Sequence, residues 1–260
     1  MKRVFAVILT LAMLSMLLVA CANGFQGSQS EQVVSEPEPV ESELIMATNA
    51  EFPPFEFIND AGDFDGFDVK LAEAIAKEIG MKLTIDNMNF DSIITAVTTE
   101  RADAGIAAMS ITEERLEEVN FTDPYFETTL VVIVPQDSSI TSPSDLNDKN
   151  IAVQEGTTSD LFVTENEDLK EPQRFKKAPD TVVELKTGRV DAIVIDRGVA
   201  DQFIGDNPDL KILDEDLGKE EYGMAVNKGN TELLTKINGA IKKLKESGEY
   251  QEIFDTFFAS

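Results

Sequence analysis

The apolar positions of this chain follow two alternating periods. Residues 44–48 and 82–85 are short apolar runs typical of strands, and the segment between them repeats apolar residues at helical spacing. The helical patterns at 93–99 and 182–187 each end at a turn and lead into a run of small and β-branched residues. This alternation of helices and strands predicts an α/β fold with parallel sheets.

Two extended apolar runs interrupt the alternation. Residues 129–134 and 222–226 carry no helical period, so we expect them to cross between two lobes. Two amphipathic helices, 231–246 and 249–258, then follow. A chain of 260 residues is long enough to give each of two lobes its own core.

The N-terminus has the pattern of an export signal, with two basic residues followed by an apolar run. Residues 18–21 resemble the bacterial lipobox, in which the signal is removed and Cys21 becomes a lipid-modified N-terminus. An ordinary secretory signal with a spare cysteine is the alternative. We therefore expect a signal peptide at 1–20, followed by the lipidated cysteine and a flexible acidic tether at 21–43.

The composition excludes several classes of function. A net charge of −27 repels nucleic acid and anionic membrane surfaces, so neither is an expected binding partner. The sequence has no histidine and one cysteine, which excludes a Ser-His-Asp triad, a Cys-His pair, a disulfide and the usual zinc sites. We expect no cofactor and no bound metal, and a protein that acts as a monomer.

The segment 109–115 contains the first candidate site. Ser110 follows the predicted strand 104–108, and Thr112 is a suitable N-cap for a helix over 113–119. Arg115 then lies in the first helical turn, where the helix dipole favours anions, so this arginine points to an anionic partner. The alternative is a surface arginine paired with a neighbouring glutamate, and this segment alone leaves both open.

A second segment repeats the pattern of the first. Residues 188–196 repeat the order of 100–108, a turn followed by a strand of small and β-branched residues. The ligands of open α/β sheets gather at the carboxyl ends of the strands, where Ala108 and Asp196 fall. One basic and one acidic half-site indicate a zwitterion held between two lobes. The glycine-containing turn at 154–159 exposes backbone N–H groups that bind anions, although simple N-capping by a threonine is the alternative.

These motifs resemble those of the polar amino-acid-binding lipoproteins of ABC importers, extracytoplasmic solute-binding proteins of the family 3 type. The resemblance covers residues 44–260 and rests on seven segments in order: 47–55, 66–69, 109–115, 120–125, 156–158, 188–196 and 222–226. It implies a two-lobed periplasmic-binding-protein fold of type II with two hinge strands. Lobe 1 would comprise 44–128 with 223–260, and lobe 2 would comprise 129–222. Such a protein closes on its ligand at the extracytoplasmic face of the bacterial membrane.

The resemblance assigns nine ligand-binding residues: Asn49, Phe52, Phe90, Ala108, Ser110, Arg115, Gln154, Thr158 and Asp196. Arg115 would hold the α-carboxylate of an amino acid, with help from the Ser110 hydroxyl and the Thr158 N–H. Asp196 would hold the α-ammonium group, together with the Ala108 carbonyl and the same hydroxyl.

The side-chain pocket is less determined. Phe52 and Phe90 would enclose the ligand's side chain from two sides. Family members that hold cationic or amide side chains often have aspartate where this chain has Asn49, so lysine, arginine, histidine and glutamine all stay open. Asp68 is expected to cap the following helix and to support the pocket from behind.

Because a fold does not fix a function, an enzyme on the same scaffold is the rival hypothesis. A cyclohexadienyl-dehydratase-like enzyme would need a general acid in the cleft, for which Glu51 and Glu155 are the candidates. The lipobox and the tether suit capture for a membrane partner better. We therefore expect a binding protein that delivers a polar amino acid to the transmembrane subunits of an ABC importer.

Overall fold

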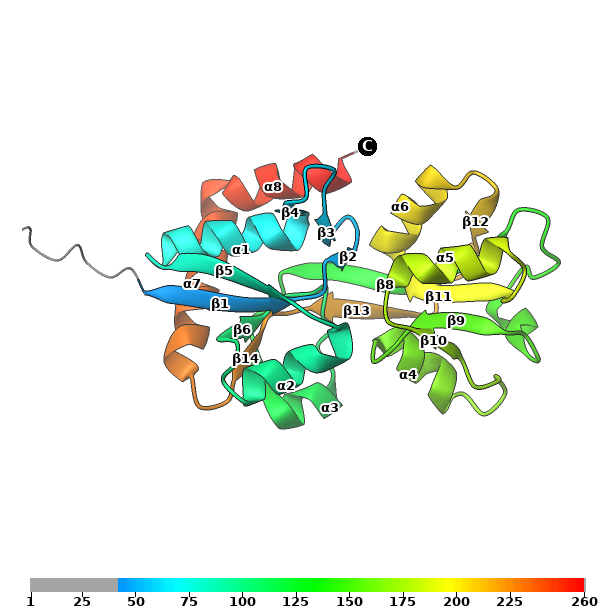
Figure 1. The fold of residues 1–260 in the computed structure, drawn as a ribbon, viewed down its shortest axis with the longest axis horizontal. Coiled ribbons are helices and arrows are strands. Elements are labelled where there is room, and N and C mark those ends of the chain that lie inside the picture. The colour runs from blue at the N-terminus through cyan, green and yellow to red at the C-terminus, as the bar shows by residue number, and fades with distance from the viewer. Residues whose placement is uncertain (1–41, 260) are drawn as a thin grey trace, which may run out of the picture. The chain divides into compact units, whose positions relative to one another are not determined.

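The computed structural model describes residues 42–259, so the expected signal peptide, Cys21 and most of the tether lie outside it (Figure 1). The strands are β1 (Glu43–Thr48), β2 (Glu51–Phe52), β3 (Glu56–Ile58), β4 (Phe64–Asp65), β5 (Lys82–Asn87), β6 (Ala104–Gly105), β7 (Val119–Phe121), β8 (Phe126–Pro135), β9 (Ile151–Gln154), β10 (Gln173–Phe175), β11 (Ala192–Asp196), β12 (Leu210–Ile212), β13 (Gly218–Tyr222) and β14 (Ala225–Asn227). The α-helices are α1 (Phe67–Glu78), α2 (Ile93–Thr98), α3 (Glu113–Glu118), α4 (Thr158–Glu165), α5 (Ala178–Lys186), α6 (Arg197–Asp206), α7 (Thr231–Ser247) and α8 (Glu249–Phe258). Two short 3₁₀ turns cover Phe90–Ser92 and Pro143–Leu146.

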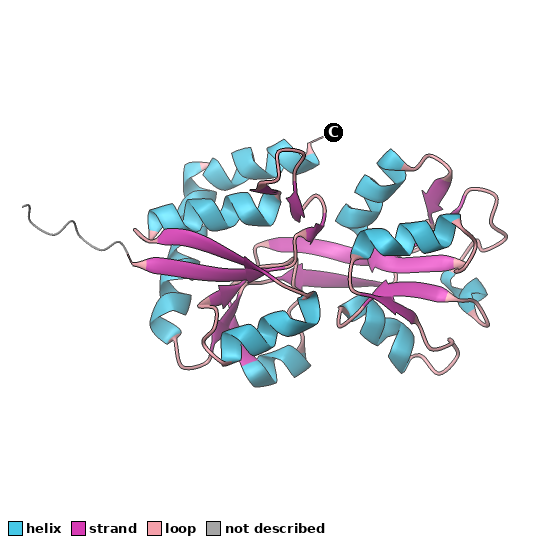
Figure 2. Ribbon diagram, in the orientation of Figure 1, coloured by secondary structure: helices cyan, strands magenta, loops and turns pink. Residues whose placement is uncertain are grey.

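Two mixed sheets and a small antiparallel sheet, β2-β3-β4, organise the described residues (Figure 2). The two mixed sheets are the larger ones. The first has the strand order β5-β1-β6-β14-β7, and the second has the order β10-β9-β11-β8-β12 with β13 also paired to β8. We call these sheets, with the helices that pack on them, the first and the second lobe. Each sheet has a parallel core, β5-β1-β6 and β10-β9-β11, and antiparallel strands beside it. The prediction of an α/β fold with parallel-sheet-based lobes is therefore confirmed, and each sheet carries antiparallel strands in addition.

The chain passes between the two sheets twice, at 122–125 and 223–224, and the two crossings lie side by side. The backbone N–H of Tyr125 donates to the carbonyl of Tyr222 at 2.9 Å, and that of Thr122 donates to Met224 at 3.0 Å. Beyond this point β8 and β13 run antiparallel into the second lobe. The two crossings therefore form a paired hinge strip rather than two independent linkers.

Local sequence explains where the helix α1 begins. Gly66 adopts φ +118°, and a Cβ at this position would lie 2.2 Å from the carbonyl oxygen of Phe55, so only glycine fits. The helix α1 then buries Val69, Leu71 and Ile75 against the first sheet. The expectation that Asp68 caps this helix is wrong, because Gly66 is the N-cap and no side chain bonds there.

A second local prediction is also corrected. The expected strand 104–108 ends at Gly105, and Ala108 has φ +44°, a left-handed conformation that no strand accommodates. A 3₁₀ turn that contains Asp91 precedes α2, and Ser92 is the N-cap of that helix. The carboxylate of Asp91 pairs with Lys176 of the second lobe, at 2.7 Å.

Candidate functional site

A cavity lies between the two lobes, at the carboxyl ends of β1, β6, β9 and β11. All nine residues that the sequence singled out line this cavity, together with Glu56, Ala107 and Thr157. Eight of the nine are buried and Thr158 is half-buried. Folding thus brings the candidate residues of both lobes into one place.

Arg115 is the basic group of the cavity. It is 7% exposed and lies in the first turn of α3, where the Thr112 hydroxyl accepts the Arg115 N–H at 3.2 Å, as predicted. Its guanidinium donates to the carbonyl of Ser110 at 2.6 Å and to that of Gly156 at 3.0 Å, and lies 5.3 Å from the ring centroid of Phe90. Burial lowers its pKa. Among the described residues it forms no ion pair, so the alternative of a surface pair with a neighbouring glutamate is wrong.

Asp196 is an acidic group at the end of β11. It occupies the N-cap position of α6, but its side chain makes no capping bond and accepts instead from the Tyr222 hydroxyl at 2.5 Å. Burial, and then the negative charge of Glu220, raises the pKa of Asp196 to about 7. No ion pair between Asp196 and Arg115 occurs in the described part of the chain, so each charge is open to a third group.

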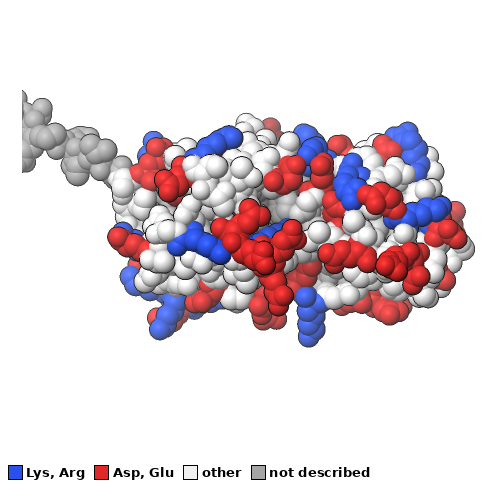
Figure 3. All heavy atoms as spheres, turned by 90° about the horizontal axis from the view of Figure 1, so that it is seen from below, with Lys and Arg blue, Asp and Glu red and all other residues white. Residues whose placement is uncertain are grey.

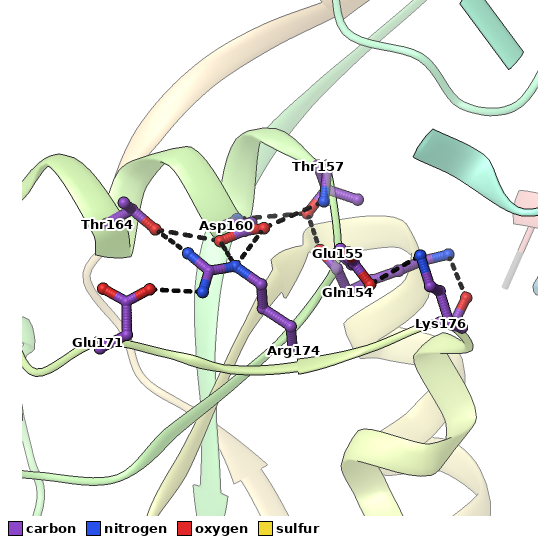
Figure 4. A network of polar contacts seen from close by, with 9 residues as sticks. Gln154, Glu155, Thr157, Asp160, Thr164, Glu171, Arg174 and Lys176 are labelled. Carbon is purple, nitrogen blue, oxygen red and sulfur yellow. Dashed lines mark hydrogen bonds and ion pairs between the residues drawn. The ribbon is translucent and has the colours of Figure 1, made fainter. Parts of the chain in front are cut away.

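The turn that carries the second lobe's contribution is held by a polar network (Figure 4). Asp160 accepts the Gly156 N–H at 3.1 Å and the Arg174 Nε–H at 2.9 Å. Thr157 caps α4 by accepting the Asp160 N–H at 3.3 Å, so the capping alternative for this turn is correct for Thr157. Thr158 is the first residue of α4, and its N–H has no partner within the helix.

Two side-chain amides, one from each lobe, form a hydrogen bond across the cavity. The Gln154 Nε2 donates to Asn49 Oδ1 at 2.8 Å, while Asn49 Nδ2 donates to the Met88 carbonyl at 2.7 Å. Because Gln154 ends β9 and Asn49 follows β1, this bond joins the two lobes directly.

The two glutamates considered for an enzyme lie outside the cavity lining. Glu51 pairs with Lys177 at 2.6 Å and Glu155 pairs with Lys176 at 2.8 Å, all partly exposed. Each is therefore engaged with a lysine at the rim. Figure 3 shows the molecule from below, where Asp and Glu side chains gather near the middle of the face.

Glu56 is the functional candidate that sequence reasoning missed. It is fully buried, lines the cavity, and neither carboxyl oxygen has a hydrogen-bond partner among the described residues. Burial, and then the charge of nearby Asp68, raises its pKa well above the ordinary value. Asp68 supports the site as expected: its carboxylate accepts from the Ala108 N–H at 2.7 Å and from the Tyr125 hydroxyl at 2.8 Å. An acid between two phenylalanines was the only sequence signal for Glu56.

Comparison with known proteins agrees with this geometry. The family model described as bacterial extracellular solute-binding proteins, family 3, matches residues 44–260. A probable histidine-binding protein of Neisseria gonorrhoeae is 35% identical over 256 residues, which cover 96% of this chain and 93% of the relative. A putative ABC transporter arginine-binding protein 2 of Escherichia coli K12 is 36% identical over 220 residues, covering 83% and 90%.

A solved structure shares the architecture. The P235GK mutant of ArgBP from T. maritima superimposes with a TM-score of 0.81 at 42% identity, covering 84% of this chain and 96% of that one. The family and these neighbours are binding proteins of transport systems rather than enzymes, which gives the dehydratase alternative no support.

Proposed function

The chain belongs to the bacterial extracellular solute-binding proteins of family 3, and we propose that it captures a cationic amino acid, arginine foremost, for an ABC importer. The main support for this proposal is that one cavity contains two buried charged residues, Arg115 and Asp196, that do not pair with each other. A buried charge without a partner is costly, so the cavity favours a ligand that brings both opposite charges. An amino-acid zwitterion does so.

The α-carboxylate fits Arg115. The guanidinium has five N–H donors, and the carbonyls of Ser110 and Gly156 use two of them, so a bidentate pair with a carboxylate is still available. The unpaired N–H of Thr158 at the start of α4 adds a donor from the other lobe. The α-ammonium fits Asp196 and the Ala108 carbonyl.

Charge balance favours a cationic side chain. Glu56 adds a second buried acid to a cavity in which Arg115 is the basic lining residue, and its raised pKa keeps this acid mainly protonated while the cavity is empty. A ligand side chain that carries a positive charge favours the ionised form of Glu56 and so gains a counter-charge. The names of the relatives agree, since they refer to arginine and histidine. Phe52 and Phe90 line the same cavity, and their faces suit the aliphatic stem or a guanidinium plane.

Calorimetry with arginine, lysine, histidine and glutamine tests the proposal. We expect arginine to bind more tightly than glutamine, and Glu56→Gln to lower arginine affinity about tenfold or more, with less than about a threefold change for glutamine. The matched control is Glu51→Gln, which removes the same charge at the rim and should leave the ratio unchanged. Equal affinities for arginine and glutamine, unaffected by Glu56→Gln, would refute the cationic assignment.

Closure on the ligand is supported by contacts between the lobes. Arg115 donates to the Gly156 carbonyl of the opposite lobe, and Asn49 accepts from Gln154. The ion pairs Lys176–Asp91 and Lys177–Glu51 also cross between the lobes, at 2.7 and 2.6 Å. The expected lobe boundaries, 44–128 with 223–260 and 129–222, put the first crossing a few residues late, because β8 begins at Phe126. We propose that the lobes meet at the hinge strip, 122–125 with 223–224.

We also propose that the mature protein is a monomer, anchored by a lipid on Cys21 at the extracytoplasmic face of the membrane. Two acyl chains are needed for stable anchoring. Mass spectrometry of the mature protein tests this, because a free thiol on Cys21 contradicts it.

A further inference from the structure

One carboxylate reaches the cavity residues from β13, next to the hinge strip, without lining the cavity itself. Glu220 lies on β13, and its Oε2 accepts from the Ser110 hydroxyl at 2.5 Å and from the Thr158 hydroxyl at 2.9 Å. The two hydroxyl oxygens lie 3.5 Å apart. Glu220 thus joins a first-lobe residue, Ser110, to a second-lobe residue, Thr158, close to the hinge strip.

The backbone fixes this arrangement. Ser110 forms an isolated bridge with Tyr222, and the flanking bonds run from Ile111 N–H to the Glu221 carbonyl at 2.9 Å and from Gly223 N–H to the Met109 carbonyl at 3.1 Å. The loop that carries Ser110 is therefore paired with the strand that carries Glu220. The Thr158 hydroxyl comes from the opposite side, on the first residue of the capped helix α4.

The hydrogen-bonding capacity of the two hydroxyls determines which group of the ligand they can bind. A serine or threonine hydroxyl has one proton to donate and two lone pairs, whereas an ionised carboxylate only accepts. Since both hydroxyls donate to Glu220, neither has a proton left for the ligand, and both present lone pairs. A group that needs acceptors is an ammonium, not a carboxylate.

We propose that Glu220 is a positioning residue that makes the Ser110 and Thr158 hydroxyls acceptors for the ligand's α-ammonium group, and so selects ligands that carry one. The inference rests on the proposed function and refines it, because Ser110 no longer helps to bind the α-carboxylate through its hydroxyl. That carboxylate is left to Arg115 and to backbone N–H groups.

The electrostatics agree with this assignment. The charge of Glu220 is, after burial, the largest cause of the raised pKa of Asp196, and it also raises the pKa of Arg115 more than any other charge does. Glu220 is thus close enough to add negative potential where the ammonium group would bind.

The test compares three ligands by calorimetry: arginine, 5-guanidinopentanoate, which lacks the α-ammonium, and agmatine, which lacks the carboxylate. In Glu220→Gln we expect arginine and agmatine to lose about tenfold in affinity, and 5-guanidinopentanoate to change less than about threefold. Glu221→Gln is the matched control, since it removes the same charge from an exposed neighbour on the same strand and should change none of the three.

The other outcomes overturn the inference. An equal loss for all three ligands would make Glu220 merely structural, and a gain for the two carboxylate ligands would make it a competitor of the ligand's carboxylate. Thr158→Val serves if Glu220→Gln does not fold, and it should show a smaller loss of the same ammonium selectivity. Failure of the unmodified protein to bind arginine would refute the proposed function itself, which keeps the two results apart.

Discussion

Replacing Asp196 by asparagine distinguishes the loss of stability caused by burying this carboxylate from its contribution to ligand binding. Asparagine has nearly the same shape and can still accept from the Tyr222 hydroxyl, but it cannot ionise. In the folded, ligand-free protein the pKa of Asp196 is raised from 3.8 to about 7. At about 1.4 kcal/mol per pKa unit, this difference corresponds to about 4 kcal/mol.

The sign follows from proton binding. Between about pH 4 and pH 7 the folded state keeps a proton that the unfolded state has released, so the free energy of unfolding falls as the pH rises through this window. Asp196→Asn removes this pH-dependent fall in the free energy of unfolding, because asparagine does not ionise. We expect the ligand-free variant to be more stable than the parent at pH 8 by about 2 to 4 kcal/mol, or roughly 4 to 16 °C in Tm, and to show little of this gain at pH 4.

Binding should change in the opposite direction. Without Asp196 the ligand's ammonium group loses its counter-charge, which costs about 2 to 5 kcal/mol, or a roughly thirty-fold to several-thousand-fold loss of affinity. Thermal unfolding at pH 4 and pH 8, with and without arginine, measures both effects. Asp214→Asn, at an exposed position of the second lobe, is the control. The same gain at both pH values, or no gain at pH 8, would show that burial of this carboxylate does not destabilise the empty site.

Three other perturbations test separate parts of the site. Arg115→Ala should weaken arginine binding by roughly thirty-fold to several thousand-fold, and a loss below threefold in calorimetry contradicts its role. Asn49→Asp should favour arginine over glutamine by about five-fold to thirty-fold in competition binding; since its lost bond to the Met88 carbonyl affects both ligands, the ratio isolates the charge, and an unchanged ratio means the residue does not face the side chain. Dyes on cysteines at Lys77 and Lys170, one in each lobe, should change their energy transfer when arginine is added, and a constant signal at saturation argues against closure.

Short-range chemistry made much of this molecule predictable. The α3 start at Thr112 and the final helices follow from signals within a few residues, because capping and periodicity are local properties. Ala108, Ser110 and Asp196 were identified from strand ends, where the ligands of α/β sheets gather, and the full set of nine cavity residues followed from the resemblance to family 3 solute-binding proteins. Their roles remain predictions.

Contacts between distant segments decided the rest. Glu220 bonds Ser110 across 110 positions, and Asp91 meets Lys176 across 85, so no local pattern distinguishes these acids from solvated ones. The charge state of Glu56 depends on burial, which the packed lobes create and the sequence does not state. By itself the sequence determined the elements and the residue types at the strand ends. Only the tertiary structure decided which polar groups lose water and which partner each one meets, because desolvation and hydrogen-bond geometry exist only once the two lobes are packed together.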